Sequence, residues 1–262
     1  MTVTEVAIDI DEYPAELRPL LTGAKLYDSS CSPEARVIFI DKDAGYFLKI
    51  GRAADLNREY ELTRYFHDKG LAAKAVDYRS DSERGYLITQ KLPGGDCIAA
   101  KYLEQPIRLA ELLGERLALL HSLDCSGCPV QNHTETYLAK AKRNYAADTF
   151  DRSHFPDSFG YLSAEEAWGV VEKQGHLLRT DTLLHGDYCL PNIMLDDWRF
   201  SGFIDLDSGG VGDRHVDIFW GVWSLRFNLK TDIYRERFID AYGRGTVDEE
   251  MLRVVAAAEV FG

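Results

Sequence analysis

Short apolar runs dominate the N-terminal third of the chain, and longer segments with helical periodicity follow. The runs at 46–50 and 86–92 predict strands, the first with a single central lysine and the second leading into a turn. Between them, the apolar positions in 56–66 predict a helix with an interior face. Further helices are predicted at 107–123, 137–147, 163–178, 216–229, 233–242 and 251–261. The pattern therefore predicts an α+β protein in which strands and one helix precede a mainly helical part.

One loop and the hairpin after it gather the groups that phosphoryl transfer needs. Asn192 follows Asp187 by five residues, and two short apolar runs at 193–195 and 200–204 flank a turn at Asp196 and Asp197. This hairpin is expected to deliver Asp205 at a strand end beside Asn192. Asp187 can accept the proton of an attacking hydroxyl, whereas Asn192 and Asp205 offer the oxygen ligands that Mg²⁺ prefers. The segment therefore predicts one base and two metal ligands.

The spacing of these groups is typical of kinases. Asp187 and Asn192 form an Asp-x-x-x-x-Asn sequence, with His185 and Gly186 where protein kinases carry His-Arg. The sequence contains no Gly-x-x-x-x-Gly-Lys-Ser/Thr segment, so a P-loop kinase is the wrong class. The loop therefore indicates a kinase-like phosphotransferase.

A family resemblance is carried by residues 184–217. This stretch reads His-Gly-Asp-x-x-x-x-Asn, then Gly-Phe-Ile-Asp-Leu, then Gly-Asp-Arg-His-Val-Asp-Ile. It closely resembles the aminoglycoside 3′-phosphotransferases, small bacterial kinases that inactivate antibiotics, and weaker likeness runs through the whole chain. The resemblance implies a two-lobed protein-kinase-like fold. Its N-terminal lobe, 1–93, would hold the nucleotide on an antiparallel sheet with one helix, and its mainly helical lobe, 94–262, would carry catalysis and acceptor binding.

The resemblance also implies a lysine for the α- and β-phosphates and a helix glutamate that holds it. Lys49 lies inside an apolar run, where a charge is costly unless it is paired. Glu59, ten residues on and within the predicted helix, aligns with the family's lysine-pairing glutamate. The alternative is that Lys49 is an edge-strand lysine that protects against aggregation.

Two further nucleotide contacts are implied by the same resemblance. Ser32 is the best match to a serine in the phosphate-covering loop, although this chain has Ser30 where the family commonly has glycine. The main chain of Gln90, Lys91 and Leu92 is the expected hinge that holds adenine. An ordinary polar loop around Ser32 and a plain surface turn after Leu92 remain the alternatives.

The acceptor pocket is expected to use an insert after 147 and the C-terminus. Asp151 and Asp157 are the carboxylates available in the insert for the acceptor's amines. Glu259 and Phe261 match positions where the family's C-terminus reaches the aminoglycoside. These four residues are therefore the predicted substrate contacts.

Four other residues matter in the comparison with the family. Asp207 stands where glycine is usual after the metal aspartate, and Phe227 with Asn228 replaces a commonly acidic pair. The second difference removes charge from the expected pocket. Asp217, by family analogy, braces the catalytic loop through hydrogen bonds.

Charge and composition narrow the partners. The net charge of −13 over 262 residues disfavours nucleic acid and suits a cationic ligand. The sequence contains no apolar run approaching ~18 residues and begins without a secretory signal, so we expect a cytoplasmic protein with no membrane partner. The five cysteines include one C-x-x-C pair, Cys125 and Cys128, but no second pair follows, so they predict neither a disulfide framework nor a zinc site. We expect a monomer or weak dimer.

These observations favour a phosphotransferase that uses Mg²⁺ and ATP, or GTP, to phosphorylate a hydroxyl of a cationic small molecule. An aminoglycoside phosphorylated at its 3′-hydroxyl, which confers resistance, is the expected acceptor; another small-molecule alcohol or antibiotic is the alternative. A metal-dependent phosphohydrolase could be built on the two His-x-Asp pairs at 185–187 and 215–217. That alternative leaves Lys49 and Glu59 without a role.

Overall fold

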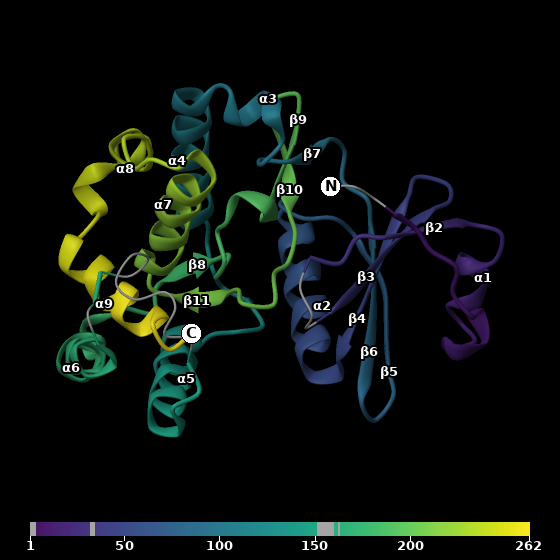
Figure 1. The fold of residues 1–262 in the computed structure, drawn as a ribbon, viewed down its shortest axis with the longest axis horizontal. Helices are drawn as coiled ribbons and strands as arrows, with labels where there is room; N and C mark the ends of the chain where they lie inside the picture. The colour runs from purple at the N-terminus through teal and green to yellow at the C-terminus, as the bar shows by residue number, and fades with distance from the viewer. Residues whose placement is uncertain (1–3, 32–34, 151–159, 162) are drawn as a thin grey trace. The chain divides into compact units, whose positions relative to one another are not determined.

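The computed structural model describes residues 4–31, 35–150, 160–161 and 163–262, and the chain divides into two units (Figure 1). The first unit comprises Met1–Gly95 with Met194–Asp207, and the second comprises Asp96–Ile193 with Ser208–Gly262.

The predicted lobes, 1–93 and 94–262, differ from these units in two respects. The first unit continues to Gly95 rather than ending at 93. Residues 194–207 return to the first unit, whereas the sequence placed them in the second. The reason is an aromatic contact: Phe203 lies edge-on to Phe66 of the first unit, with ring centroids 6.3 Å apart. The functions expected of the two lobes stay predictions.

A six-stranded antiparallel sheet forms the first unit, in the order β1-β2-β3-β4-β6-β5. One face of the sheet packs against the N-terminal segment, which supplies buried Tyr13, Leu17 and Leu21. A 3₁₀ turn and a short helix, α1, lie in that segment. The bounds are β1 Thr4–Glu5, η1 Ile10–Glu12, α1 Arg18–Leu21, β2 Lys25–Asp28, β3 Arg36–Asp41, β4 Tyr46–Arg52, β5 Ala75–Ser80 and β6 Arg84–Gln90.

Strand β4 is central, because β3 and β6 pair with it on its two sides. Successive side chains of a strand point to opposite faces. Leu48 therefore joins the core under the N-terminal segment, whereas Lys49, paired with Val37 and Leu87, points to the opposite face. The alternative of Lys49 as an edge-strand lysine is wrong.

Helix α2, Ala53–Asp68, follows β4 directly and packs on strands β4, β5 and β6. Its buried stripe is Leu56, Glu59, Leu62, Thr63 and Phe66. The sequence predicted the helix at 56–66. The helix starts earlier because alanines with high helix propensity precede the apolar stripe.

The hairpin of β9, Ile193–Asp196, and β10, Arg199–Phe203, turns through Asp197 and Trp198, whose φ angles are 46° and 66°. Two positive φ values in a two-residue connection match a type I′ turn, which suits the twist of paired strands. The sequence placed this turn at Asp196 and Asp197. Strand β7, Gly95–Asp96, completes a three-stranded sheet in the order β10-β9-β7.

The second unit is mainly helical, and its helices pack into two neighbouring apolar clusters. Helix α9 joins both, because Ala257 and Ala258 face α6 while Val254 and Val255 pack near Val216 of α7. A two-stranded antiparallel ladder, β8 with β11, lies in the same unit. The bounds are α3 Ala100–Leu103, α4 Pro106–His121, α5 His133–Ala147, α6 Ala164–Gln174, η3 Gly175–Leu177, β8 Thr182–Leu184, η4 Leu190–Asn192, β11 Gly210–Gly212, α7 His215–Leu229, α8 Arg235–Tyr242, η5 Arg244–Thr246 and α9 Glu249–Glu259.

The helix predictions for this unit are confirmed, with ends that shift by a few residues. Helix α5 begins four residues early, at His133 rather than 137, because His133 and Thr134 are themselves buried. The ladder of β8 with β11 was not predicted, since each strand has only three residues. In the described part of the chain, none of the helices combines the length and apolar character that a membrane span needs.

Close packing of α4 on α8 generates a stability prediction. A Cβ on Gly114 of α4 would lie 2.4 Å from the carbonyl oxygen of Phe238 in α8, whereas one on exposed Gly169 of α6 would meet nothing within 4 Å. Gly114→Ala should lower the free energy of unfolding by about 1–3 kcal/mol through overpacking. Gly169→Ala, the matched control, should raise it by roughly 0.5–1 kcal/mol through helix propensity. Urea unfolding measures both, and equal effects of the two variants would contradict the packing argument.

Candidate active site

The loop that carries Asp187 is fixed from the interior of the second unit. Asp217, fully buried in the first turn of α7, accepts the backbone N–H of His185 through Oδ2 and that of Gly186 through Oδ1, both at 2.7 Å. Burial alone would raise the pKa of Asp217, but its hydrogen bonds and the neighbouring His121 hold the pKa below the ordinary aspartate value. The bracing hydrogen bonds expected of Asp217 are present.

His121, at the end of α4, continues this network. Its Nε2 lies 3.1 Å from Asp217 Oδ2, and its Nδ1 lies 2.9 Å from the hydroxyl of Tyr242. Burial lowers the pKa of His121 below its ordinary value, against the raising effect of Asp217. A neutral imidazole that donates to the carboxylate and accepts from Tyr242 satisfies all three groups.

Asp187 itself is half-buried, and Asn192 holds its carboxylate. The Nδ2 of Asn192 donates to Asp187 Oδ2 at 2.8 Å and to the Asp187 carbonyl at 3.0 Å. Between them, the backbone N–H of Leu190 donates to Ser224 Oγ of α7 at 2.9 Å. The two hydrogen bonds hold Asp187 and Asn192 in a fixed relative position. The separation of five residues lets the short loop between them close.

Gly186 could not be replaced without moving this loop. Its φ is +85°, and a Cβ there would lie 1.9 Å from the carbonyl oxygen of Ser208. A side chain is therefore excluded both by the backbone conformation and by the space. This explains why the chain has glycine where protein kinases carry arginine.

The predicted pairing of Lys49 with Glu59 is present in the first unit. Lys49 Nζ lies 2.8 Å from Glu59 Oε2 and also donates to Asp205 Oδ1. Burial would lower the pKa of Lys49, but the charges of Glu59 and Asp205 outweigh it and raise the pKa. Burial raises the pKa of Glu59, with Lys49 acting in the opposite direction. The lysine is therefore a firmly protonated cation held between two carboxylates.

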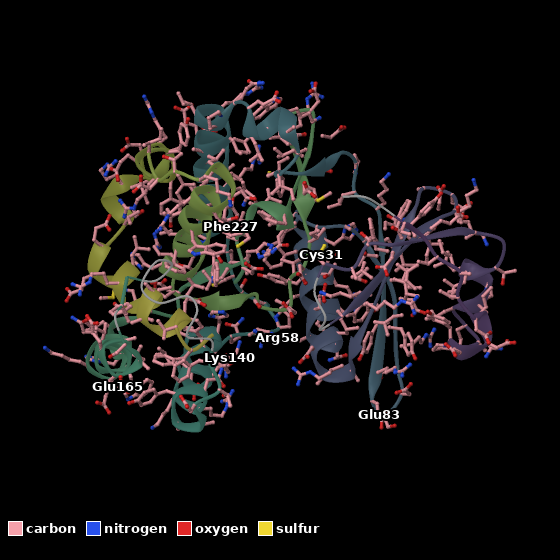
Figure 2. All side chains as sticks on the ribbon, viewed as in Figure 1. Cys31, Arg58, Glu83, Lys140, Glu165 and Phe227 are labelled. Atoms are coloured by element: carbon pink, nitrogen blue, oxygen red, sulfur yellow. The ribbon has the colours of Figure 1, made fainter. Side chains whose placement is uncertain are left out.

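Asp205 and Asp207 lie on the loop after β10, and α2 holds this loop at a second point. Asp205 has a φ of 60°, unusual for a residue with a side chain. Arg58 Nε donates to the Asp207 carbonyl at 2.6 Å, and Figure 2 labels Arg58 on α2. Sequence reasoning missed Arg58, although its position next to Glu59 could have suggested a contact near the lysine pair.

The expected hinge residues follow strand β6. The backbone N–H of Gln90 donates to Lys74 O at 2.9 Å, and that of Lys91 donates to Gly45 O at 3.0 Å. These two N–H groups are already used within the unit. The adenine contacts expected of the Gln90, Lys91 and Leu92 main chain stay predictions. The Leu92 side chain lies 2.8 Å from where a Cβ on Gly202 would stand.

Three of the predicted site residues, Ser32, Asp151 and Asp157, lie outside the described residues. Near Ser32, the hydroxyl of Ser30 accepts the backbone N–H of Val37 at 3.0 Å. Ser30, which stands where the family commonly has glycine, thus helps to close the base of this loop.

The two C-terminal candidates differ in their surroundings. Glu259 Oε1 accepts from the hydroxyl of Tyr137 at 2.9 Å and from Trp220 Nε1 at 3.1 Å. Burial raises the pKa of Glu259 to about 7, the bonds from Tyr137 and Trp220 oppose it, and the charge of Asp187 adds to it. Phe261 is fully buried and packs edge-on against Tyr145. Its ring packs among the helices of this unit, and the contact expected between Phe261 and an acceptor stays a prediction.

The groups invoked for a phosphohydrolase have structural partners instead. His215 Nδ1 lies 2.7 Å from Asp213 Oδ1, and its Nε2 accepts the backbone N–H of Asp248 at 2.9 Å. Asp217 is committed to the catalytic loop. In the parts of the chain that are described, no three His, Cys, Asp or Glu side chains cluster in a way that could hold a metal ion. The geometry therefore disfavours a two-metal hydrolase.

Comparison with known proteins agrees with this geometry. The model of the phosphotransferase enzyme family matches residues 32–254. A probable aminoglycoside 3′-phosphotransferase of Lactococcus lactis is 48% identical over 258 residues, which cover 98% of each chain. An aminoglycoside 3′-phosphotransferase of Niallia circulans is 29% identical over 218 residues, covering 82% of this chain and 83% of that protein.

Solved structures share the fold. The crystal structure of an aminoglycoside 3′-phosphotransferase of type VIII superposes with a TM-score of 0.79 at 23% identity, covering 97% of this chain and 99% of that one. An aminoglycoside phosphotransferase from Streptomyces rimosus, solved with ADP and streptomycin, superposes with a TM-score of 0.73 at 20% identity, covering 86% and 90%. The predicted two-lobed kinase-like fold is thus confirmed. Because the family model matches most of the chain and one relative is nearly half identical along its whole length, this chain belongs to the phosphotransferase enzyme family and, within it, to the aminoglycoside 3′-phosphotransferases.

Proposed function

We propose that the chain transfers the γ-phosphate of ATP, with GTP as the alternative donor, to the 3′-hydroxyl of an aminoglycoside and so confers resistance to it. The observation that carries the proposal is the fixed catalytic loop. Asp187 is held by Asn192, and the backbone before it is bonded to buried Asp217. The names of the relatives supply the acceptor class. We also propose a cytoplasmic monomer or weak dimer, since the cytoplasm supplies the nucleotide.

Asp187 acts as the base in this proposal. The acceptor hydroxyl must lose its proton as it attacks phosphorus, and a carboxylate in hydrogen-bonding reach can take that proton. The bond from Asn192 Nδ2 orients the carboxylate, so that little reorientation is needed when the acceptor binds. His185 and Gly186 contribute through their backbone, which Asp217 fixes.

Lys49 is the proposed partner of the α- and β-phosphates. A cation that two carboxylates keep protonated stays available to phosphate oxygens at any physiological pH. Glu59 keeps the ammonium in place when Asp205 turns toward a metal. Ser32 and the main chain at Gln90, Lys91 and Leu92 are the further nucleotide contacts that we propose.

Asn192 and Asp205 are the oxygen donors that we propose for Mg²⁺. Asn192 uses its Nδ2 on Asp187, which directs its amide oxygen elsewhere, and Asp205 is about half exposed at 45% of its side-chain surface. Both are hard oxygen donors, and Mg²⁺ is commonly held by one or two carboxylates together with substrate phosphates rather than by a cage of protein ligands. Bound there, the ion would neutralise charge on the nucleotide's phosphates during transfer.

Glu259, with Asp151 and Asp157, is the proposed anionic part of the acceptor site. A carboxylate near Asp187 attracts the ammonium groups of an aminoglycoside when it is ionised. Because the pKa of Glu259 lies at about 7, its charge is present above that pH and is lost as the pH falls through it. The bound acceptor's ammonium groups would in turn favour the ionised form.

Asp187→Asn should lower kcat by about 10²–10⁴-fold, because the base that takes the acceptor's proton is lost. Nucleotide affinity should stay near that of the wild type, since the carboxylate does not hold phosphates. Steady-state kinetics with kanamycin and calorimetric nucleotide titration measure the two effects. Asp196→Asn, at the exposed end of strand β9, is the matched control and should leave both unchanged. Turnover like that of the wild type in Asp187→Asn would overturn the role of the base.

Asp205→Ala should raise the Mg²⁺ concentration needed for nucleotide binding, because the strongest anionic ligand is removed. Asn192→Ala should have the same effect more mildly, since an amide oxygen is the weaker ligand. Calorimetric titration of ATP at several Mg²⁺ concentrations measures the change. An unaltered Mg²⁺ dependence in Asp205→Ala would place the metal elsewhere.

Glu259→Gln should raise the KM for kanamycin and for neomycin at pH 8 while leaving kcat close to that of the wild type. Glutamine keeps an oxygen that can accept from Tyr137 and Trp220, so the variant removes charge rather than structure. The difference between the enzymes should shrink at moderate salt and below pH 7, where Glu259 is protonated. Failure of the wild type to phosphorylate any aminoglycoside would leave the fold standing and overturn the proposed acceptor.

A further inference from the structure

Three aromatic rings follow one face of α7. Trp220, Trp223 and Phe227 are spaced three and seven residues apart, which places them on the same side of a helix. The centroids of Trp220 and Trp223 lie 5.4 Å apart, and Trp223 stacks on Phe227 with centroids 5.0 Å apart and an angle of 9°. We call this set the aromatic ladder. Phe227, labelled in Figure 2, is 55% exposed.

The ladder begins near the base. Asp217, one turn before Trp220 on α7, accepts the backbone N–H groups of His185 and Gly186, which directly precede Asp187. Trp220 Nε1 donates to Glu259 Oε1 at 3.1 Å. Ser224, on the adjoining face of the same helix, accepts the Leu190 N–H of the catalytic loop. Seven residues of helix span roughly 10 Å. The ladder therefore begins one turn after Asp217, which braces the catalytic loop, and runs along the same helix past Ser224.

The outer end of the ladder already holds an ammonium group. Lys230 Nζ lies 4.2 Å from the centroid of Phe227, within the range of a cation–π contact. A ring face that is open to this lysine is accessible to an amine of similar size. Asn228, the next residue, donates from Nδ2 to Ser224 O at 2.8 Å. Phe227 thus presents an aromatic face, and the Asn228 amide is hydrogen-bonded within its own helix. Neither residue carries a carboxylate.

We propose that the aromatic ladder is the platform on which this enzyme holds the rings of its acceptor beyond the one that reacts. An amino sugar has both an apolar C–H face and ammonium groups. Trp223 and Phe227 fit these two features by stacking and by cation–π attraction, and Glu259 supplies the anionic end. The proposal rests on the proposed function, because it names how an aminoglycoside is bound. The proposal implies that the enzyme selects its acceptors by the shape of their rings as well as by their charge.

Phe227→Leu keeps an apolar side chain at an exposed position and removes only the ring. It should raise the KM for kanamycin by about 3- to 10-fold, the size expected for one cation–π or stacking contact. The kcat and the affinity for ATP should stay near those of the wild type. Lys230→Met should lower the KM, since it removes the ammonium that occupies the same ring face. Ile233→Ala, an exposed apolar residue outside the ladder, is the matched control and should change neither constant.

A binding measurement separates this proposal from the phosphoryl transfer itself. Titrating kanamycin without nucleotide should change the intrinsic tryptophan fluorescence, and Trp223→Phe should reduce that change. Phe227→Leu should weaken the measured Kd, and Ile233→Ala should match the wild type. Wild-type turnover of kanamycin with the same KM and Kd in Phe227→Leu would overturn the ladder and leave the proposed function intact. Absence of turnover with every aminoglycoside would overturn both.

Discussion

The arrangement of the catalytic loop depends on one buried carboxylate. Asp217 has no access to solvent and is satisfied by the amides of His185 and Gly186 and by the ring of His121. A buried ionised carboxylate without hydrogen-bond donors is strongly destabilising. Movement of the loop would take two donors away from Asp217 and is therefore unfavourable. The placement of Asp187, directly after these two amides, is therefore determined by the helical core. Tyr242 and His121 extend this support through α8 and α4.

The largely buried charge in the first unit is a cation, the ammonium of Lys49. Lys49 lies on a central strand of the sheet, away from the solvent-exposed edges. The alternation of side chains along the strand directs the Lys49 side chain toward α2. Glu59 meets it there from a buried position on the helix. Asp205, from a segment more than 150 residues away in sequence, completes the set. Strand, helix and returning hairpin are thus joined by a single protonated side chain.

Sequence patterns predicted the elements and pairs that depend on local spacing. The Asp-x-x-x-x-Asn segment and the lysine inside an apolar strand carry their own chemistry, because each charge needs a specific partner. Other features depend on contacts between distant segments, which no local pattern encodes. Arg58 donates to a backbone carbonyl, an acceptor that every residue offers. The burial of Phe261 cannot be read from the local sequence, because a phenylalanine near the C-terminus can be buried or exposed. The return of 194–207 to the first unit is likewise visible only once Phe203 meets Phe66.

Arg58 and Glu59 are neighbours on one helix, so their directions from the helix axis are fixed about 100° apart. One of them holds the lysine and the other holds the carbonyl of Asp207. Movement of the helix along or around its axis therefore displaces the Lys49 ammonium and the loop of Asp205 together. Neither group can change its position independently of the other. This bond from Arg58 also restricts the backbone at Asp207. A loop that is clamped at its carbonyl from outside does not need a flexible residue to find its conformation, and the chain is free to place a charge there.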